Sequence, residues 1–336
     1  MSKIKAPVQT RRNNLADVIP LNTPYMLFID PCNACNFKCN FCAPQSCAKQ
    51  VHFKHMIMDL EKYKKVIDDV KCFPKPLKML RLYTMGEPLM NPCFPEMVYY
   101  AKINEVSEYI ETVTNGSLLN PALNQRIAES GIDRVRISVE GIDNDTYKNV
   151  CQTNLLIKHL VDNVRDLYER TRNTGVEVYV KTIDATVNTT EKKNIFYKMF
   201  EHISDSMFIE SIAPLWPDFD ELDDRYDYSN NKIMGGKRIE KISCCPFIFY
   251  GMVINPDGVV TPCCSDWKRG YEFGNAFKTP ITKIWGNEKM LYMWREMLKG
   301  NRSRFSSCRN CQYLQYASND NIDEAAVDIL SRLSGI

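Results

Sequence analysis

Three cysteines lie within eight residues of each other in the segment Cys35-Asn-Phe-Lys-Cys39-Asn-Phe-Cys42. Thiolates at this spacing can hold three irons of a cubane iron–sulfur cluster and leave the fourth iron open to another ligand. A single zinc ion is the alternative, and its fourth ligand would be one of Cys32, Cys47, His52 and His55. Zinc sites more often show paired C-x2-C spacings, so the C-x3-C-x2-C spacing favours the cluster.

A second group of cysteines lies in the C-terminal third of the chain, at Cys244, Cys245, Cys263, Cys264, Cys308 and Cys311. Four ligands can be taken from this group as Cys245, Cys263, Cys308 and Cys311. Four thiolates suit either an iron–sulfur cluster or a structural zinc ion. Because the group contains two adjacent pairs, a ligand set that uses Cys244 and Cys264 is the alternative.

The composition also indicates metal binding inside the cell. The 14 cysteines are too many for packing alone, and 336 residues are too many for a small disulfide-stapled scaffold. The first twenty residues contain basic groups but no apolar h-region, so we expect no secretory signal and a cytoplasmic protein. No apolar run approaches the ~20 residues of a membrane span, and the net charge is only +2. We therefore expect neither a membrane nor a nucleic acid as partner.

Strands alternate with helices over the first two thirds of the chain. Apolar or alternating runs predict strands at 25–30, 79–84, 108–114, 134–139, 176–183 and 207–212. Helical periodicity predicts helices at 60–70, 95–106, 123–130, 157–172 and 191–203, with Asp59 as the N-cap of the first. This alternation specifies an α/β fold with a parallel sheet, and six units are too few for an eightfold barrel. We expect a partial (β/α)6 TIM-like barrel, with its chemistry at the carboxyl ends of the strands.

The pattern changes after the sixth strand. An acidic stretch that includes Asp218–Asp227 is either a solvated linker or a site for a cationic substrate. Apolar runs at 247–254 and 259–261 then flank a hairpin turn, and a helix is predicted at 281–298. The hydrophobic core of so small a domain gives limited stability, and a metal cluster would supply the additional stabilisation. The expected segments are an N-terminal extension (1–23), the barrel (24–215), an acidic linker (216–242), a cluster domain (243–316) and a tail helix (317–336).

The first cysteine motif, at the end of the first predicted strand, resembles that of the radical S-adenosylmethionine (radical SAM) superfamily. In that family an aromatic residue precedes the third cysteine, and Phe41 stands in this place. The resemblance implies that Cys35, Cys39 and Cys42 bind a 4Fe–4S cluster whose open iron binds S-adenosyl-L-methionine. It also implies reductive cleavage to a 5′-deoxyadenosyl radical, which abstracts a hydrogen atom from the substrate. A flavodoxin- or ferredoxin-like protein would donate the electron.

The resemblance extends to polar groups at the ends of the later strands. The segment Thr84-Met85-Gly86-Glu87-Pro88 resembles the family's Gly-Gly-Glu segment, which binds the methionine ammonium, although Met85 replaces the first glycine. Similar strand ends follow at Thr114-Asn115-Gly116 and Ser138-Val-Glu140. The resemblance thus implies S-adenosylmethionine contacts from Phe41, Gly86, Glu87, Asn115, Ser138, Glu140 and Lys181. Solvated loop residues are the alternative reading of these positions.

The C-terminal cysteines resemble the SPASM extension in its shortened form, called twitch, because no cysteine follows Cys311. The resemblance implies one auxiliary cluster, 4Fe–4S or 2Fe–2S. Three spare thiols, Cys151, Cys244 and Cys264, are candidates for returning a hydrogen atom to a substrate radical. Twitch relatives modify sugars and aminoglycosides, so we expect oxidation or epimerisation of a small polar substrate, such as a sugar or amino sugar. The alternatives are a peptide-modifying maturase and a non-enzymatic structural zinc protein.

Overall fold

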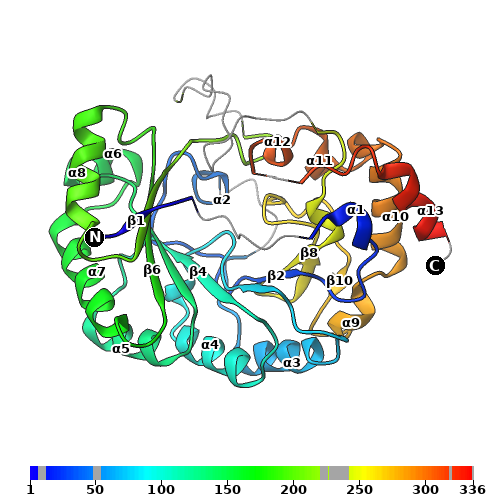
Figure 1. The fold of residues 1–336 in the computed structure, drawn as a ribbon, viewed down its shortest axis with the longest axis horizontal. Coiled ribbons are helices and arrows are strands. Elements are labelled where there is room, and N and C mark those ends of the chain that lie inside the picture. Colours follow the sequence, from blue (N-terminus) through cyan, green and yellow to red (C-terminus); the bar gives the residue numbers. More distant parts are fainter. Residues whose placement is uncertain (7–12, 48–53, 220–225, 227–241, 318–319, 335–336) are drawn as a thin grey trace.

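The computed structural model describes residues 1–6, 13–47, 54–219, 226, 242–317 and 320–334. Within these residues one ten-stranded sheet runs in the order β1-β7-β6-β5-β4-β3-β2-β8-β9-β10 (Figure 1). Its strands are β1 (Lys3–Ile4), β2 (Met26–Ile29), β3 (Met79–Arg81), β4 (Ile110–Thr114), β5 (Arg134–Ser138), β6 (Glu177–Ile183), β7 (Ser206–Glu210), β8 (Gly251–Ile254), β9 (Val259–Thr261) and β10 (Gly274–Asn275). All pairs from β1 to β8 are parallel.

Helices cover the convex side of this curved sheet (Figure 1). They are α3 (Leu60–Val70), α4 (Phe94–Ile103), α5 (Pro121–Glu129), α6 (Asn144–Val150), α7 (Ile157–Thr171) and α8 (Thr190–Phe200). The Asp59 side chain caps α3 by accepting from the Lys62 backbone amide at 3.0 Å, as predicted. All six predicted strands and five predicted helices are present, and the predicted partial barrel is confirmed. The short helix α6 was not predicted.

Part of the expected N-terminal extension belongs to the sheet. Strand β1 pairs parallel with β7, and the Ser2 hydroxyl donates to the backbone carbonyls of Ser204 (2.7 Å) and Glu201 (2.9 Å). Helix α1 (Leu15–Val18) also packs on the barrel, with Leu15 buried in the main core. A strand of two residues leaves no periodic pattern in the sequence, because alternation needs at least four residues to be recognised.

The predicted C-terminal hairpin continues the barrel sheet. Strand β8 pairs parallel with β2, which would otherwise expose an unpaired edge. Strand β9 turns back antiparallel to β8, and Gly258 in the turn has a φ of +83°. The single helix expected at 281–298 is divided into α9 (Ile281–Ile284) and α10 (Glu288–Leu298), because Gly286 has a φ of +74°. Helix α13 (Ala326–Ser334), in the expected tail, packs on α10.

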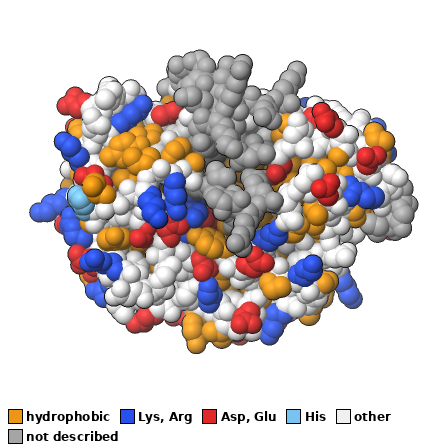
Figure 2. All heavy atoms as spheres, viewed as in Figure 1, with side chains coloured by type: hydrophobic (Ala, Val, Ile, Leu, Met, Phe, Trp, Pro, Cys, Tyr) orange, Lys and Arg blue, Asp and Glu red, His pale blue; other side chains and the backbone are white. Residues whose placement is uncertain are grey.

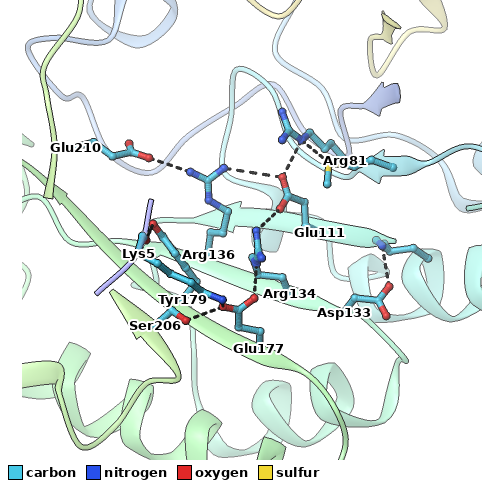
Figure 3. A network of polar contacts seen from close by, with 12 residues as sticks. Lys5, Arg81, Glu111, Asp133, Arg134, Arg136, Glu177, Tyr179, Ser206 and Glu210 are labelled. Atoms are coloured by element: carbon cyan, nitrogen blue, oxygen red, sulfur yellow. Dashed lines mark hydrogen bonds and ion pairs between the residues drawn. The ribbon is translucent and has the colours of Figure 1, made fainter. Parts of the chain in front are cut away.

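The two faces of the sheet differ in chemistry. Leu80, Val135 and Val178 are fully buried and belong to the apolar core. The alternate positions on β3 to β7 carry charged side chains, which meet on the other face (Figure 3). The barrel therefore encloses a polar, charged face below the strand ends where chemistry is expected.

The described outer surface carries both signs of charge. On the face seen in Figure 2, basic and acidic side chains are interspersed among the residues described. Among the described helices, none has the length and apolarity that crossing a bilayer requires.

Candidate active site and auxiliary cluster site

Buried amides fix the loop that follows β2 and carries the first cysteine motif. The Asn33 side chain accepts from the Met56 amide at 2.7 Å and donates to the Lys54 carbonyl at 3.2 Å. The Asn91 side chain donates to the carbonyls of Pro31 and Met58, both at 3.0 Å. The loop is thus held in position by side-chain hydrogen bonds, and the short helix α2 (Ala43–Ser46) begins directly after Cys42.

The three motif thiols lie together at the carboxyl end of β2. Burial raises the pKa of Cys35 to about 12, and the nearby Cys39 thiol also raises it. Burial raises the pKa of Cys42, as do the Cys39 and Cys35 thiols. The pKa of Cys39 is raised by the adjacent Cys151 thiol and by burial. Three neighbouring thiolates are unfavourable in this buried place unless a cationic centre neutralises them, so the donor set fits an iron–sulfur cluster.

A single zinc ion fits this loop less well. Of the proposed fourth ligands, Cys32 donates to the Ala34 carbonyl at 3.5 Å and His55 contacts the Asn33 carbonyl at 3.1 Å. Cys47 is buried, and His52 lies outside the described residues.

The Gly86-Glu87 segment packs directly on the cysteine loop. A Cβ atom at Gly86 would lie 2.1 Å from the Cys32 carbonyl oxygen, so only glycine fits. The buried Glu87 carboxylate accepts from the Thr114 hydroxyl at 2.6 Å and from the Asn115 backbone amide at 2.7 Å. It also accepts from the Leu89 backbone amide. Burial nevertheless raises its pKa to about 7. Glu87 therefore ties the ends of β3 and β4 together, and its predicted contact with the methionine ammonium stays a prediction.

Two further predicted contact residues lie at the loop. The side-chain amide of Asn115 donates to the Asn36 side chain at 2.9 Å and to the Cys35 sulfur at 3.8 Å. The Phe41 ring packs edge-on against Tyr226, with 6.3 Å between ring centroids. The structure thus brings Asn115 to the cluster thiols, while Phe41 packs toward the segment after β7.

The other three predicted contact residues lie on neighbouring strands. Ser138 on β5 is directly opposite Lys181 on β6. The Lys181 ammonium pairs with the Glu210 carboxylate at 2.6 Å, so it is engaged within the barrel. Burial raises the pKa of Glu140 to about 7, although the charge of Lys181 lowers it. Ser138, Glu140 and Lys181 therefore form one group at the strand ends of β5 and β6.

Asp30, the last residue before the cysteine loop, was missed by the sequence reasoning. Its side chain is fully buried, and neither oxygen has a well-formed hydrogen bond to a described group. Burial raises its pKa to about 7, although the Thr84 hydroxyl, nearby backbone amides and Arg269 favour the charged form. Its position at a strand end beside the motif is the signal that would have identified it.

This shift predicts a pH-dependent stability effect of Asp30→Asn. Between the ordinary aspartate pKa and about 7, the folded state keeps a proton that the unfolded state loses, so the wild type loses stability as pH rises. Asp30→Asn removes this loss. We expect its free energy of unfolding to exceed that of the wild type by roughly 4 kcal/mol at pH 8, with little difference near pH 4. Urea titrations at both pH values measure this, and an equal gain at both would contradict the assignment.

The second cysteine group also brings four thiols together. Burial raises the pKa of Cys263, as do the Cys311 and Cys308 thiols among its neighbours. Burial raises the pKa of Cys308, as do Cys245 and Cys311. Burial raises the pKa of Cys245 to about 12, and the Cys311 thiol adds to this. The predicted set of Cys245, Cys263, Cys308 and Cys311 is thus mutually close, and it fits a cluster by the same reasoning as the first site.

The spare thiols lie in different surroundings. Cys244 is buried in the apolar core, and its backbone amide donates to Asp323 at 2.8 Å. The Cys264 thiol donates to the Tyr313 hydroxyl at 3.8 Å. Cys151 is buried at the end of α6, where its carbonyl accepts from the Lys38 amide at 3.0 Å. Cys264 and Cys151 thus border the two cluster sites, whereas Cys244 packs as a small apolar residue.

These surroundings predict different iron contents for two neighbouring substitutions. Cys245→Ala should lower the iron content of the reconstituted protein from about eight to about four atoms per chain. Cys244→Ala should leave about eight, because its thiol packs in the core. Iron and sulfide analysis after anaerobic reconstitution measures both. Loss of iron from Cys244→Ala with retention in Cys245→Ala would show the alternative ligand set to be correct.

A buried ionic network lines the charged face of the barrel (Figure 3). Glu111 on β4 receives Arg81 at 2.7 Å and Arg134 at 3.4 Å, and Arg136 lies at 3.9 Å. Arg136 continues to Glu210 at 3.0 Å. Although burial alone would raise it, these arginines hold the pKa of Glu111 below its ordinary value. The sequence signal was the alternation of charged and apolar residues along the predicted strands, such as Arg134-Val-Arg136.

The acidic stretch contributes little to the described structure. Asp218 accepts from the Asn310 side chain at 2.7 Å, and Tyr226 donates to the Asn40 side chain. The other acidic residues proposed for a cationic substrate, Asp220, Glu221, Asp223, Asp224 and Asp227, lie outside the described residues.

Comparisons with known proteins agree with this arrangement. The family model of the radical SAM superfamily matches residues 29–192, and that of the SPASM iron–sulfur cluster-binding domain matches residues 244–312. The tungsten-containing aldehyde ferredoxin oxidoreductase cofactor-modifying protein of Pyrococcus furiosus is 26% identical over 325 residues, which cover 85% of this chain and 86% of that protein.

Solved structures share the fold at low sequence identity. BtrN in complex with AdoMet and 2-DOIA has a TM-score of 0.56 at 17% identity, over 89% of this chain and 97% of that chain. Native anSMEcpe with bound AdoMet and the Cp18Cys peptide has a TM-score of 0.54 at 17% identity, over 93% and 97%. This chain therefore carries a radical SAM superfamily domain at residues 29–192, followed by a SPASM iron–sulfur cluster-binding domain at residues 244–312.

Proposed function

We propose that this enzyme abstracts a hydrogen atom from a small polar substrate, such as a sugar or amino sugar, and thereby oxidises or epimerises it. The observation that carries the proposal is the group of three thiols at the carboxyl end of β2, above a charged barrel face. When bound, the 4Fe–4S cluster and S-adenosylmethionine supply the 5′-deoxyadenosyl radical. A flavodoxin- or ferredoxin-like protein is the proposed electron donor.

The chain's own residues hold and orient these groups. Cys35, Cys39 and Cys42 would bind the cluster, and Asn115 would orient the Cys35 sulfur through its hydrogen bond. Glu87 would hold the strand ends in register so that backbone carbonyls of its segment can accept from the methionine ammonium. Packing around the loop would keep water from the reacting carbon.

The charged barrel face favours a small polar substrate. Buried cations and carboxylates there offer both donors and acceptors, which a polar molecule can match. BtrN was solved with a small molecule, 2-DOIA, over nearly the same length of chain. A peptide substrate is the second candidate, because anSMEcpe, with the same fold, was solved with a bound peptide.

Deuterium transfer tests the proposal. The anaerobically reconstituted enzyme is incubated with S-adenosylmethionine, dithionite and deuterated candidate sugars, amino sugars or peptides. We expect deuterium in the 5′-deoxyadenosine only with the substrate class that fits, because the abstracted atom is retained in that product. Formation of 5′-deoxyadenosine with deuterium from peptides alone would replace the small-molecule proposal by the peptide one. Absence of 5′-deoxyadenosine despite intact clusters would overturn both.

A further inference from the structure

Arg81 is held rigidly by one edge of its guanidinium group. It lies on β3 between Phe28 of β2 and Glu111 of β4 in the sheet register. Its Nε atom is 2.7 Å from a Glu111 carboxylate oxygen, and the guanidinium carbon is 5.2 Å from the centroid of the Phe28 ring. These two contacts fix the plane of the guanidinium group. Little further side-chain entropy is therefore lost when a ligand binds to it.

The outer edge of this guanidinium has no partner among the residues that the structure describes. Arg134 and Arg136 each approach two carboxylates, whereas Glu111 is the one carboxylate of the described chain that pairs with Arg81. Its contacts with the described residues all use Nε or the face of the guanidinium, so Nη1 and Nη2 are left to donate elsewhere. The Arg81 side chain is 19% exposed, although it lies inside the barrel.

The local charge is also unbalanced around Arg81. Among the described residues, the three carboxylates of the network are shared by five cations. The carboxylates are Glu111, Glu177 and Glu210, and the cations are Lys5, Arg81, Arg134, Arg136 and Lys181. Glu140 adds a carboxyl group, but its charged neighbours are Lys181 and Glu210, which lie on strands three and four positions away from β3. Arg81 shares its carboxylate partner with two other arginines. Its buried charge is therefore stabilised further when an anion binds it.

The groups around Arg81 place this anion beside the predicted auxiliary cluster site. The phenols of Tyr83 and Tyr313 and the thiol of Cys264 are close enough to act on its charge. Tyr83 packs edge-on against Phe28, with 5.4 Å between ring centroids. Cys264 and Tyr313 follow closely after the predicted auxiliary ligands Cys263 and Cys311.

We propose that Arg81 is the residue that binds an anionic group of the substrate, a carboxylate or a phosphate, through Nη1 and Nη2. The planar pair of donors matches either oxyanion in a bidentate contact, and the two phenols add single hydrogen bonds. The inference rests on the proposed function, because it names the charge class of the small substrate in the same barrel. The contact would place the anionic group of the substrate beside the predicted auxiliary cluster.

Anion binding to the holoenzyme tests this directly. Wild type, Arg81→Met, Arg81→Lys and the surface control Arg126→Met, whose residue pairs with exposed Glu96, are titrated calorimetrically with inorganic phosphate and, separately, with acetate. We expect saturable binding of at least one anion to wild type and to Arg126→Met, and affinity reduced about tenfold or more by Arg81→Met. Arg81→Lys keeps the charge without the planar pair and should recover part of the affinity. The anion that binds more tightly identifies the group as phosphate or carboxylate.

The same titrations are repeated with saturating S-adenosylmethionine. Retained anion binding supports a substrate site, whereas displacement by S-adenosylmethionine would overturn the inference, because Arg81 would then serve that molecule's own carboxylate. Equal affinity of wild type and Arg81→Met, or no saturable binding to wild type, would also overturn it. The proposed function fails separately, through absence of 5′-deoxyadenosine from the wild type under dithionite.

Discussion

Replacement of Cys39 by alanine is expected to abolish the formation of 5′-deoxyadenosine from S-adenosylmethionine. The Cys39 thiol lies beside Cys42 and Cys151 at the carboxyl end of β2, and no other motif thiol can take its place without moving the loop. Because the reaction depends on a correctly held cluster, we expect a loss of at least about a thousandfold, or about 4 kcal/mol in the barrier. Chromatography of the products after anaerobic reconstitution and dithionite reduction measures this.

A matched control separates loss of the site from general thiol chemistry. Cys72 is exposed at the end of α3, so Cys72→Ala should keep the wild-type rate and the full iron content. Cys39→Ala should retain about four irons per chain, held by the auxiliary site. A Cys39→Ala protein with the wild-type rate would show that the three-thiol assignment is wrong.

Most of the barrel could be predicted from local patterns. Each central strand and helix has the hydrophobic periodicity of its own type. Asp59 marks the start of α3 through a hydrogen bond to a residue only three positions away. The pairing of β8 with β2 could not be predicted in this way, because it joins residues more than two hundred positions apart. The strand β1 is too short to carry a pattern, and its pairing with β7 is equally remote in sequence.

In the candidate site, too, local features were predictable and contacts between distant residues were not. The cysteine motif is local, so spacing alone predicts Cys35, Cys39 and Cys42 as ligands, and the structure brings their thiols together. The partners of Glu87 and Lys181 depend on which strands are neighbours and in which register they pair. The sequence therefore predicts both residues as S-adenosylmethionine contacts without predicting their partners within the protein. The comparisons bear out the cofactors, while the individual S-adenosylmethionine contacts stay predictions.

The ionic network is the part of the site in which register matters most. Glu111 lies opposite Arg81 on one side and Arg134 on the other, so a single carboxylate meets arginines from both neighbouring strands. A shift of either strand by one residue would turn the charged side chains into the apolar layer. The network therefore specifies the register of the central strands as well as the charge of the barrel face.

Removing the Glu111 charge should consequently destabilise the barrel strongly. Glu111→Gln leaves the shape nearly unchanged, but it leaves Arg81 without its carboxylate and deprives Arg134 and Arg136 of a shared one. Loss of one partner from a buried ion pair costs about 3–5 kcal/mol of the free energy of unfolding. Urea titrations at neutral pH under anaerobic conditions measure the difference.

Glu96→Gln is the matched control, because Glu96 pairs with Arg126 where both side chains are roughly half exposed, and its loss should cost at most about 1 kcal/mol. The dependence on pH supplies an independent check. The arginines hold the pKa of Glu111 below its ordinary value, so its stabilisation is complete above the ordinary glutamate pKa and is lost as pH falls through the lower folded value. The gap between wild type and Glu111→Gln should therefore narrow on acidification. A gap no larger than that of Glu96→Gln at neutral pH would mean that the three arginines do not depend on this carboxylate, and the register argument would lose its physical basis.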